Sequence, residues 1–164
     1  METKKITNST LINGVALGFS VAFLISSLIA AVYTHETGNI LHGWYLIMTS
    51  PSPLVTDYLE IGGLPSAMLN AGLACWIFMV GLKGDSRPST LAGYFLVVAH
   101  CFYGLNFLTM WPCFLAPFLY LQLKKLDFKS NLHVCMFTTS FGPFIGELLF
   151  RYTQNNFVFE HPTL

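Results

Sequence analysis

The chain has 164 residues, of which 54% are hydrophobic and 10% are charged, and its formal net charge is zero. Soluble domains of this length carry about a quarter charged residues, and the mean hydropathy of +0.58 is too high for one. A balanced charge without a basic stripe excludes nucleic acid as a partner. The composition predicts a single all-α membrane domain over residues 1–164, with the lipid bilayer as its solvent.

Three apolar segments follow one another in the first half. Residues 11–33 are uncharged and long enough to cross a hydrocarbon core of about 30 Å at about 1.5 Å per residue. Residues 40–48 are apolar but too short to cross, so we expect them to lie along the membrane or dip into it. Residues 62–82 form a second uncharged span, whose small residues recur every four positions and predict close helix contacts.

The second half is interrupted by proline and glycine. Residues 90–123 carry no charge but are too short for two full spans, so they predict two short helices or a re-entrant hairpin. We favour the pair of short helices. Residues 131–150 are long enough to cross, but Gly142 and Pro143 interrupt them and predict a broken helix. The chain therefore has about five predicted membrane segments, some of them short, broken or re-entrant.

Basic residues indicate the orientation of these segments. Seven of the eight fall in three segments that can share one side of a membrane: Lys4, Lys5, Lys83, Arg87, Lys124, Lys125 and Lys129. By the positive-inside tendency, the N-terminus and the loops around residues 83–87 and 124–129 are cytoplasmic. We therefore expect a multi-pass protein of the cell (cytoplasmic) membrane.

An internal echo relates two proline-containing segments. Residues 50–58 and 140–148, 90 positions apart, each have Ser, then Pro three residues on, two apolar residues and an acid. The same spacing places equivalent loops on opposite sides, which is typical of an inverted repeat, here residues 11–82 and 101–150. Coincidence stays the alternative, because short motifs often match by chance.

Acidic residues beside the first of these segments are the leading candidates for a solute path. Asp57 and Glu60 would share one face of a helix, and Ser52 and Thr56 place hydroxyl groups beside them. No basic residue is near in sequence, so a bound cation or a proton would compensate a buried carboxylate. The alternative is that Thr56 or Asp57 caps a helix in the wet interface.

Three further polar residues lie in apolar surroundings and complete the candidate path. Glu147 is either functional or paired with Arg151 one turn later. Asn70 and Asn106 either join helices or line a pore, because an amide in lipid needs partners from another helix.

Enzyme chemistry has little support in the sequence. His35, Glu36 and His42 lack HExxH spacing, the four cysteines are isolated, and His100 is either a proton relay or a packed side chain. We therefore predict no catalytic, metal-binding or cofactor-binding residues.

Three stretches resemble a family of uncharacterised bacterial and archaeal multi-pass membrane proteins, classed as a domain of unknown function. They are SPSPLVTDYLEIGGLPSAMLNAGL, FYGLNFLTMWPCFLAPFLY and FTTSFGPFIGELLF. The resemblance implies a membrane location and no particular activity. Because members look longer than this chain, it also implies a fragment, or one module that pairs with another.

These observations favour a permease for a small solute, coupled to cations or protons, with unknown substrate. The alternatives are a structural or assembly subunit and, less favoured, a membrane-embedded enzyme. We expect a homo-oligomer or a second membrane module as partner, because a chain this small needs one to enclose an aqueous route.

Overall fold

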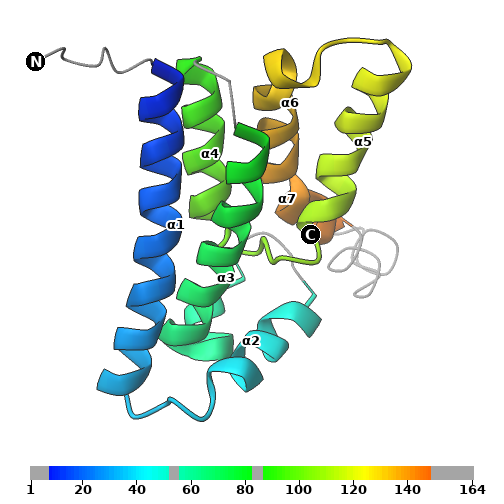
Figure 1. The fold of residues 1–164 in the computed structure, drawn as a ribbon. Helices are drawn as coiled ribbons and strands as arrows, with labels where there is room; N and C mark the ends of the chain where they lie inside the picture. Colours follow the sequence, from blue (N-terminus) through cyan, green and yellow to red (C-terminus); the bar gives the residue numbers. More distant parts are fainter. Residues whose placement is uncertain (1–7, 52–55, 83–86, 149–164) are drawn as a thin grey trace, which may run out of the picture.

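The computed structural model describes residues 8–51, 56–82 and 87–148, and every regular element in these ranges is a helix (Figure 1). This confirms the predicted all-α class. The helices in chain order are α1 (Asn8–Tyr33), α2 (Ile40–Thr49), α3 (Tyr58–Leu82), α4 (Pro88–His100), α5 (Met110–Leu123), α6 (Phe128–Ser140) and α7 (Gly142–Gly146).

The long helices α1 and α3 lie side by side and run in opposite directions (Figure 1). By length and composition, one helix among the described residues, Thr10–Tyr33, is long and apolar enough to cross a membrane. Ile40–Thr49 and Met110–Leu123 are shorter apolar helices. The first predicted span is therefore present as a continuous helix.

Small residues allow α1 and α3 to approach closely. The hydroxyl group of Ser20 donates to the carbonyl of Gly72 at 3.1 Å, and that of Ser27 donates to the carbonyl of Pro65 at 2.6 Å. A Cβ atom added to Gly72 would lie 2.8 Å from Cδ2 of Leu24. The predicted stripe of small residues also packs within the chain, because Ala71, Ala74 and Cys75 are buried in one cluster with Ile12 and Ala16 of α1.

A kink divides α3 near its start. Gly63 has φ 77° and ψ 162°, a conformation that glycine adopts readily because it has no Cβ atom. Pro65 follows in the first turn of the main helix. Its missing backbone N–H group costs nothing there, because the first N–H groups of a helix have no partner within the helix. The first turn, residues 58–62, therefore runs in a different direction from the rest of α3.

This first turn and α2 form a short hairpin. Gly43 lies against the backbone of Gly62, and Ile47, one turn later, packs in one cluster with Tyr58, one turn earlier. The two segments are therefore antiparallel. We call residues 40–62 the first hairpin; it enters the bundle from the end where α1 finishes (Figure 1).

Helix α4 enters the bundle from the opposite end and α5 runs back toward that end, with α6 packed between the two (Figure 1). We call residues 88–123 the second hairpin. With 13 and 14 residues, α4 and α5 are about 20 Å long each, too short to cross a bilayer alone. The predicted pair of short helices is therefore present. Residues 101–109 join them near the middle height of the bundle.

Helix α6 packs against both α4 and α5 and begins beside three lysines. Asp127 caps it by accepting from the backbone N–H of Ser130 at 2.8 Å, and hydrogen bonding to Ser130 lowers the pKa of Asp127. The helix ends at Ser140, and α7 begins at Gly142, where the sequence predicted a break.

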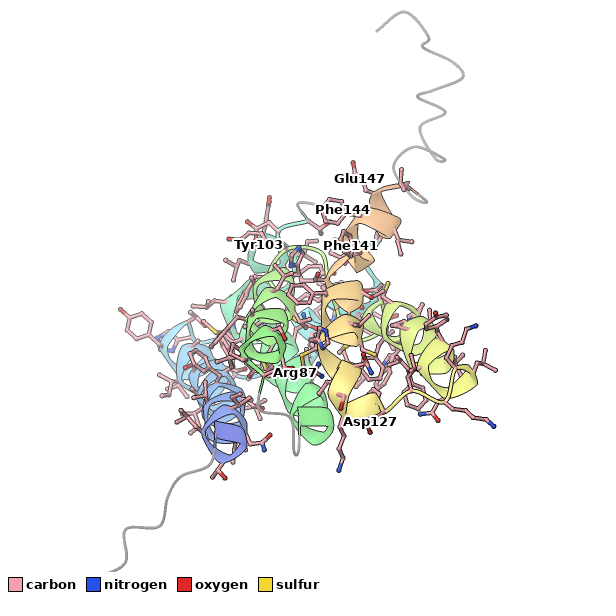
Figure 2. The ribbon with its side chains drawn as sticks, turned by 90° about the horizontal axis from the view of Figure 1, so that it is seen from above. Arg87, Tyr103, Asp127, Phe141, Phe144 and Glu147 are labelled. Carbon is pink, nitrogen blue, oxygen red and sulfur yellow. The ribbon has the colours of Figure 1, made fainter. Side chains whose placement is uncertain are left out.

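Charged and apolar residues are distributed as in a membrane protein. Helix α1 begins at the end of the bundle where α4 starts and where the α5–α6 turn lies, so the described basic residues gather there (Figures 1 and 2). We call this the basic end. Large apolar side chains cover the outward faces of most helices, which in water would be a severe exposure. Examples are Leu17, Val21, Ile25, Leu28, Ile29, Val32, Leu41, Leu115, Leu119 and Ile145.

The α1–α3 contact predicts a difference between two glycines. Gly72→Val should destabilise the protein by about 1–3 kcal/mol, because the added atoms overlap Leu24. Gly18→Ala on α1 is the matched control; a Cβ atom there meets nothing within 4 Å, so stability should be unchanged or slightly higher. Thermal unfolding in detergent measures both. Equal stability of the two variants would contradict the packing.

Candidate functional site

The candidate site lies where the tips of the two hairpins meet. The side chain of Asn106 donates to the carbonyl of Ile47 at 3.0 Å, and the backbone N–H of Tyr58 donates to the carbonyl of Phe102 at 3.2 Å. The rings of Trp44 and Phe107 lie 6.3 Å apart. We call this region the hairpin junction.

Asn70, on α3, forms hydrogen bonds with the irregular segment of the second hairpin. Its side chain is fully buried and donates to the carbonyls of Cys101 at 2.9 Å and Leu105 at 3.1 Å. Its carbonyl oxygen accepts from the backbone N–H of Phe107 at 3.1 Å. These partners all belong to one irregular segment, so Asn70 acts here as a joint between helices.

Asn106, which lies within that irregular segment, also joins two parts of the fold. It is fully buried, and its carbonyl oxygen accepts from the backbone N–H groups of Leu108 at 2.9 Å and Thr109 at 2.8 Å, capping α5. Its amide group reaches the first hairpin through Ile47. Of the two interpretations given to Asn70 and Asn106, the described contacts support the one in which they join helices.

Asp57 lies at the edge of the junction, beside Tyr103 in an isolated antiparallel bridge. Its side chain is exposed, and one carboxylate oxygen accepts from the backbone N–H groups of Leu59 at 2.8 Å and Glu60 at 3.3 Å. It therefore caps the first turn of α3, as the capping alternative predicted. Thr56 beside it is half-buried, and Ser52 lies outside the described residues.

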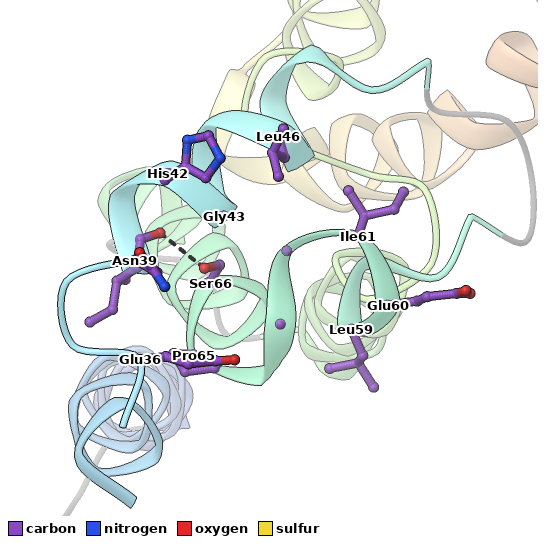
Figure 3. Close-up of a pocket in the computed structure, with 13 residues that line it drawn as sticks. Glu36, Asn39, His42, Gly43, Leu46, Leu59, Glu60, Ile61, Pro65 and Ser66 are labelled. Carbon is purple, nitrogen blue, oxygen red and sulfur yellow. Dashed lines mark hydrogen bonds between the residues drawn. The ribbon is translucent and has the colours of Figure 1, made fainter. Parts of the chain in front are cut away.

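A cavity of about 420 Å³ lies between α2 and the start of α3, at the end of the bundle away from the basic end (Figure 3). We call it the outer pocket. Two carboxylates, one imidazole and two small polar groups contribute to its wall. These are Glu36, Asn39, His42, Glu60 and Ser66.

Among the predicted site residues, only Glu60 lines the outer pocket, and Figure 3 shows its carboxylate at the rim, directed away from Ser66. Glu36 is half-buried, and one of its carboxylate oxygens accepts from the hydroxyl group of Thr34 at 3.3 Å. Glu36 and His42 were not predicted as site residues, because they lack zinc-site spacing. The feature of the sequence that could have identified them is their position after the apolar span at residues 11–33, near the expected edge of the membrane.

Glu147 and His100 do not line the outer pocket. Glu147 follows α7, is half-buried, and lies at the periphery of the bundle beyond Phe144 (Figure 2). The Nδ1 atom of His100 lies 2.8 Å from the carbonyl of Leu96 in its own helix. Across the described ranges, no group of three or more His, Cys, Asp or Glu residues could hold a metal ion.

The fold and the junction define an all-helical, apolar protein in which short helices enter from both ends and stop inside. Residues 36–160 match a family described as Protein of unknown function (DUF1576). The chain therefore belongs to that family, as its three motifs suggested, and the match begins after α1. No curated protein and no solved structure gives a significant match.

The contacts of Asn70 generate a stability prediction. Asn70→Leu keeps the approximate volume but leaves two carbonyls and one N–H of residues 101–107 without their partner. Each buried group left unpaired costs about 1–3 kcal/mol, so the free energy of unfolding should fall sharply. Asn39→Leu is the control, because Asn39 is exposed and makes no side-chain cap. Denaturant unfolding in detergent would refute the network if both variants matched the parent.

Proposed function

We propose that this chain is a multi-pass protein of the cell (cytoplasmic) membrane that moves a small cation, or a solute coupled to cations or protons, across the bilayer. In this proposal the N-terminus and the basic end face the cytoplasm. The observation that carries the proposal is the meeting of two hairpins, one from each end of the bundle, at a common junction.

Broken helices of this kind suit transport because they bring the dipoles of helix ends to a solute inside the membrane. The C-terminal end of α2 and the N-terminal end of α5 both reach the junction. Carbonyl groups at the first attract cations, and N–H groups at the second attract anions or acceptors. A continuous helix offers neither group, because its backbone bonds are all internal.

Asp57 supplies the charge that favours a cation or a proton. Because it is tied to Tyr103 at the junction, the proposed orientation places it well inside the bilayer. Within the part of the chain that the structure describes, the hydrogen bonds of its cap use one carboxylate oxygen, Oδ1, so Oδ2 is able to meet a cation or carry a proton.

The outer pocket is the entrance in this proposal. Leu46 lines the pocket, and the next residue, Ile47, accepts the hydrogen bond from Asn106 at the junction. Glu36 and Glu60 give the pocket wall a negative potential that concentrates cations near the entrance. Helix α2 therefore contributes neighbouring residues to the entrance and to the junction.

We also propose that the chain assembles with further copies of itself or with a second membrane module. An exposed carboxylate such as Asp57 is costly against lipid, so a protein or aqueous environment must cover that face. The assembly-subunit alternative relied on the small-residue stripe of α3 as a docking face. Ala71, Ala74 and Cys75 of that stripe are already buried in one cluster with residues of α1, which leaves this alternative without its main support.

The proposal predicts a loss of flux when the charge of Asp57 is removed. Asp57→Asn retains an oxygen that can cap α3, so folding should persist while cation or proton flux into proteoliposomes falls by about tenfold or more. Asp127→Asn is the matched control, because Asp127 also caps a helix but lies in a turn at the basic end. Parent-like flux in Asp57→Asn, with normal thermal stability, would remove this carboxylate from the mechanism.

A further inference from the structure

Helices α2 and α4 begin with related sequences. Residues 41–47 read LHGWYLI and residues 91–97 read LAGYFLV, so Leu, Gly and Leu are identical at a spacing of 50 positions. The positions between them carry a pair of aromatic residues in both, and a β-branched residue ends both. This correspondence is separate from the 90-residue echo, which stays a prediction.

Helix boundaries follow the same 50-residue spacing. Helix α1 begins at Asn8 and α3 at Tyr58, and they have 26 and 25 residues. Each is followed by a shorter helix, α2 or α4, that ends near the hairpin junction. Because α1 and α3 run in opposite directions, residues 8–57 and 58–107 have inverted orientations (Figure 1).

Burial agrees at the equivalent positions of α2 and α4. A Cβ atom on Gly43 would meet the backbone of Gly62, and one on Gly93 would lie 3.0 Å from Cβ of Met136. Ile47 and Val97 are 0% and 1% exposed. The same face of each helix therefore packs inward, Gly43 against α3 and Gly93 against α6.

The two halves also use the same place on the long helices. Ser66 of α3 lies against Gly43 and donates to the carbonyl of Ile40 in α2 at 2.9 Å. Fifty positions earlier is Ala16 of α1, whose carbonyl accepts from the hydroxyl group of Tyr94 in α4 at 3.0 Å. Thus α2 contacts α3 where α4 contacts α1.

The α2–α3 contact borders an open pocket, whereas the α4–α1 contact is closed. Ser66, itself 1% exposed, lines the outer pocket, whereas Ala16 and Tyr94 are fully buried in the core. Asn13, the counterpart of the pocket residue Gly63, has a buried side-chain oxygen with no hydrogen-bond partner among the described residues. A polar atom without a partner is costly in a packed interface but ordinary in a wet cleft.

We propose that residues 8–57 and 58–107 are inverted copies of one unit, and that a second cleft between α1 and α4, at the basic end, admits the same solute when the outer pocket closes. The inference rests on the proposed function and adds the second access site. Asn13 and Ala16 of α1 would line this cleft together with Ala92, the counterpart of His42. The hydrogen bond from Tyr94 to Ala16 holds it shut.

Thiol labelling of the full chain in oriented membrane vesicles tests this inference without measuring transport. Asn13→Cys reports on the basic end and His42→Cys on the outer pocket, each in the presence and absence of Tyr94→Phe. A membrane-impermeant maleimide is the probe, and the parent chain gives the background, since its four cysteines are buried. Tyr94→Phe should raise labelling at Asn13→Cys from the cytoplasmic side by about fivefold and lower labelling at His42→Cys from the other side.

Tyr120→Phe is the matched control, because Tyr120 is 57% exposed, and neither labelling rate should change. If Tyr94→Phe does not fold, the tyrosine is kept, and His42→Cys is linked to Glu60→Cys by a bifunctional maleimide to close the outer pocket. That link should also raise labelling at Asn13→Cys. A rise at Asn13→Cys without a fall at His42→Cys, or no change at either, would overturn the paired clefts. Lost flux with intact coupled labelling would instead contradict the proposed function alone.

Discussion

The fold depends on one constraint, which is that irregular backbone inside an apolar bundle must find its hydrogen bonds within the protein. Residues 101–109 leave helical geometry in the middle of the structure, where no water is available if lipid surrounds it. Asn70 and Asn106 supply the missing partners, and both side chains are fully buried. Without them, two short helices and their connection would be less stable than one continuous helix. The hairpin junction exists because two amides satisfy a segment that regular structure does not.

The same constraint connects the fold to the proposed activity. A membrane protein that only needs to be stable can use continuous helices, whose backbone groups are paired within each helix. This chain instead stops helices inside the bundle and surrounds their ends with fixed dipoles. Such an arrangement provides polar groups at depth, which is the requirement for moving a small polar solute. The glycine contact between α2 and α3 and the kink at Gly63 shape the outer pocket.

Much of the helix content was predictable, because it follows from apolar segments and from residues that interrupt them. The span at residues 11–33, the short helices after residue 90 and the break before Gly142 all agree with the structure. The hairpin arrangement was less predictable, since it depends on which distant backbone groups Asn70 and Asn106 meet. Their joining role was one of two open alternatives, as was the capping role of Asp57. Glu36 and His42 were missed as pocket residues because tertiary packing, and no sequence motif, brings α2 beside α3.

The central claim is that the second hairpin ends deep in the bilayer instead of crossing it. Spin labels at single positions, with oxygen and a water-soluble nickel complex as relaxation agents, measure depth directly. Leu108 at the hairpin tip is 55% exposed and suits a label, as does Val21 in the middle of α1 at 44%. The account predicts equal depths for labels at Leu108 and Val21, with a label at Lys125 in the α5–α6 turn fully aqueous. A label at Leu108 as accessible to the nickel complex as one at Lys125 would contradict it.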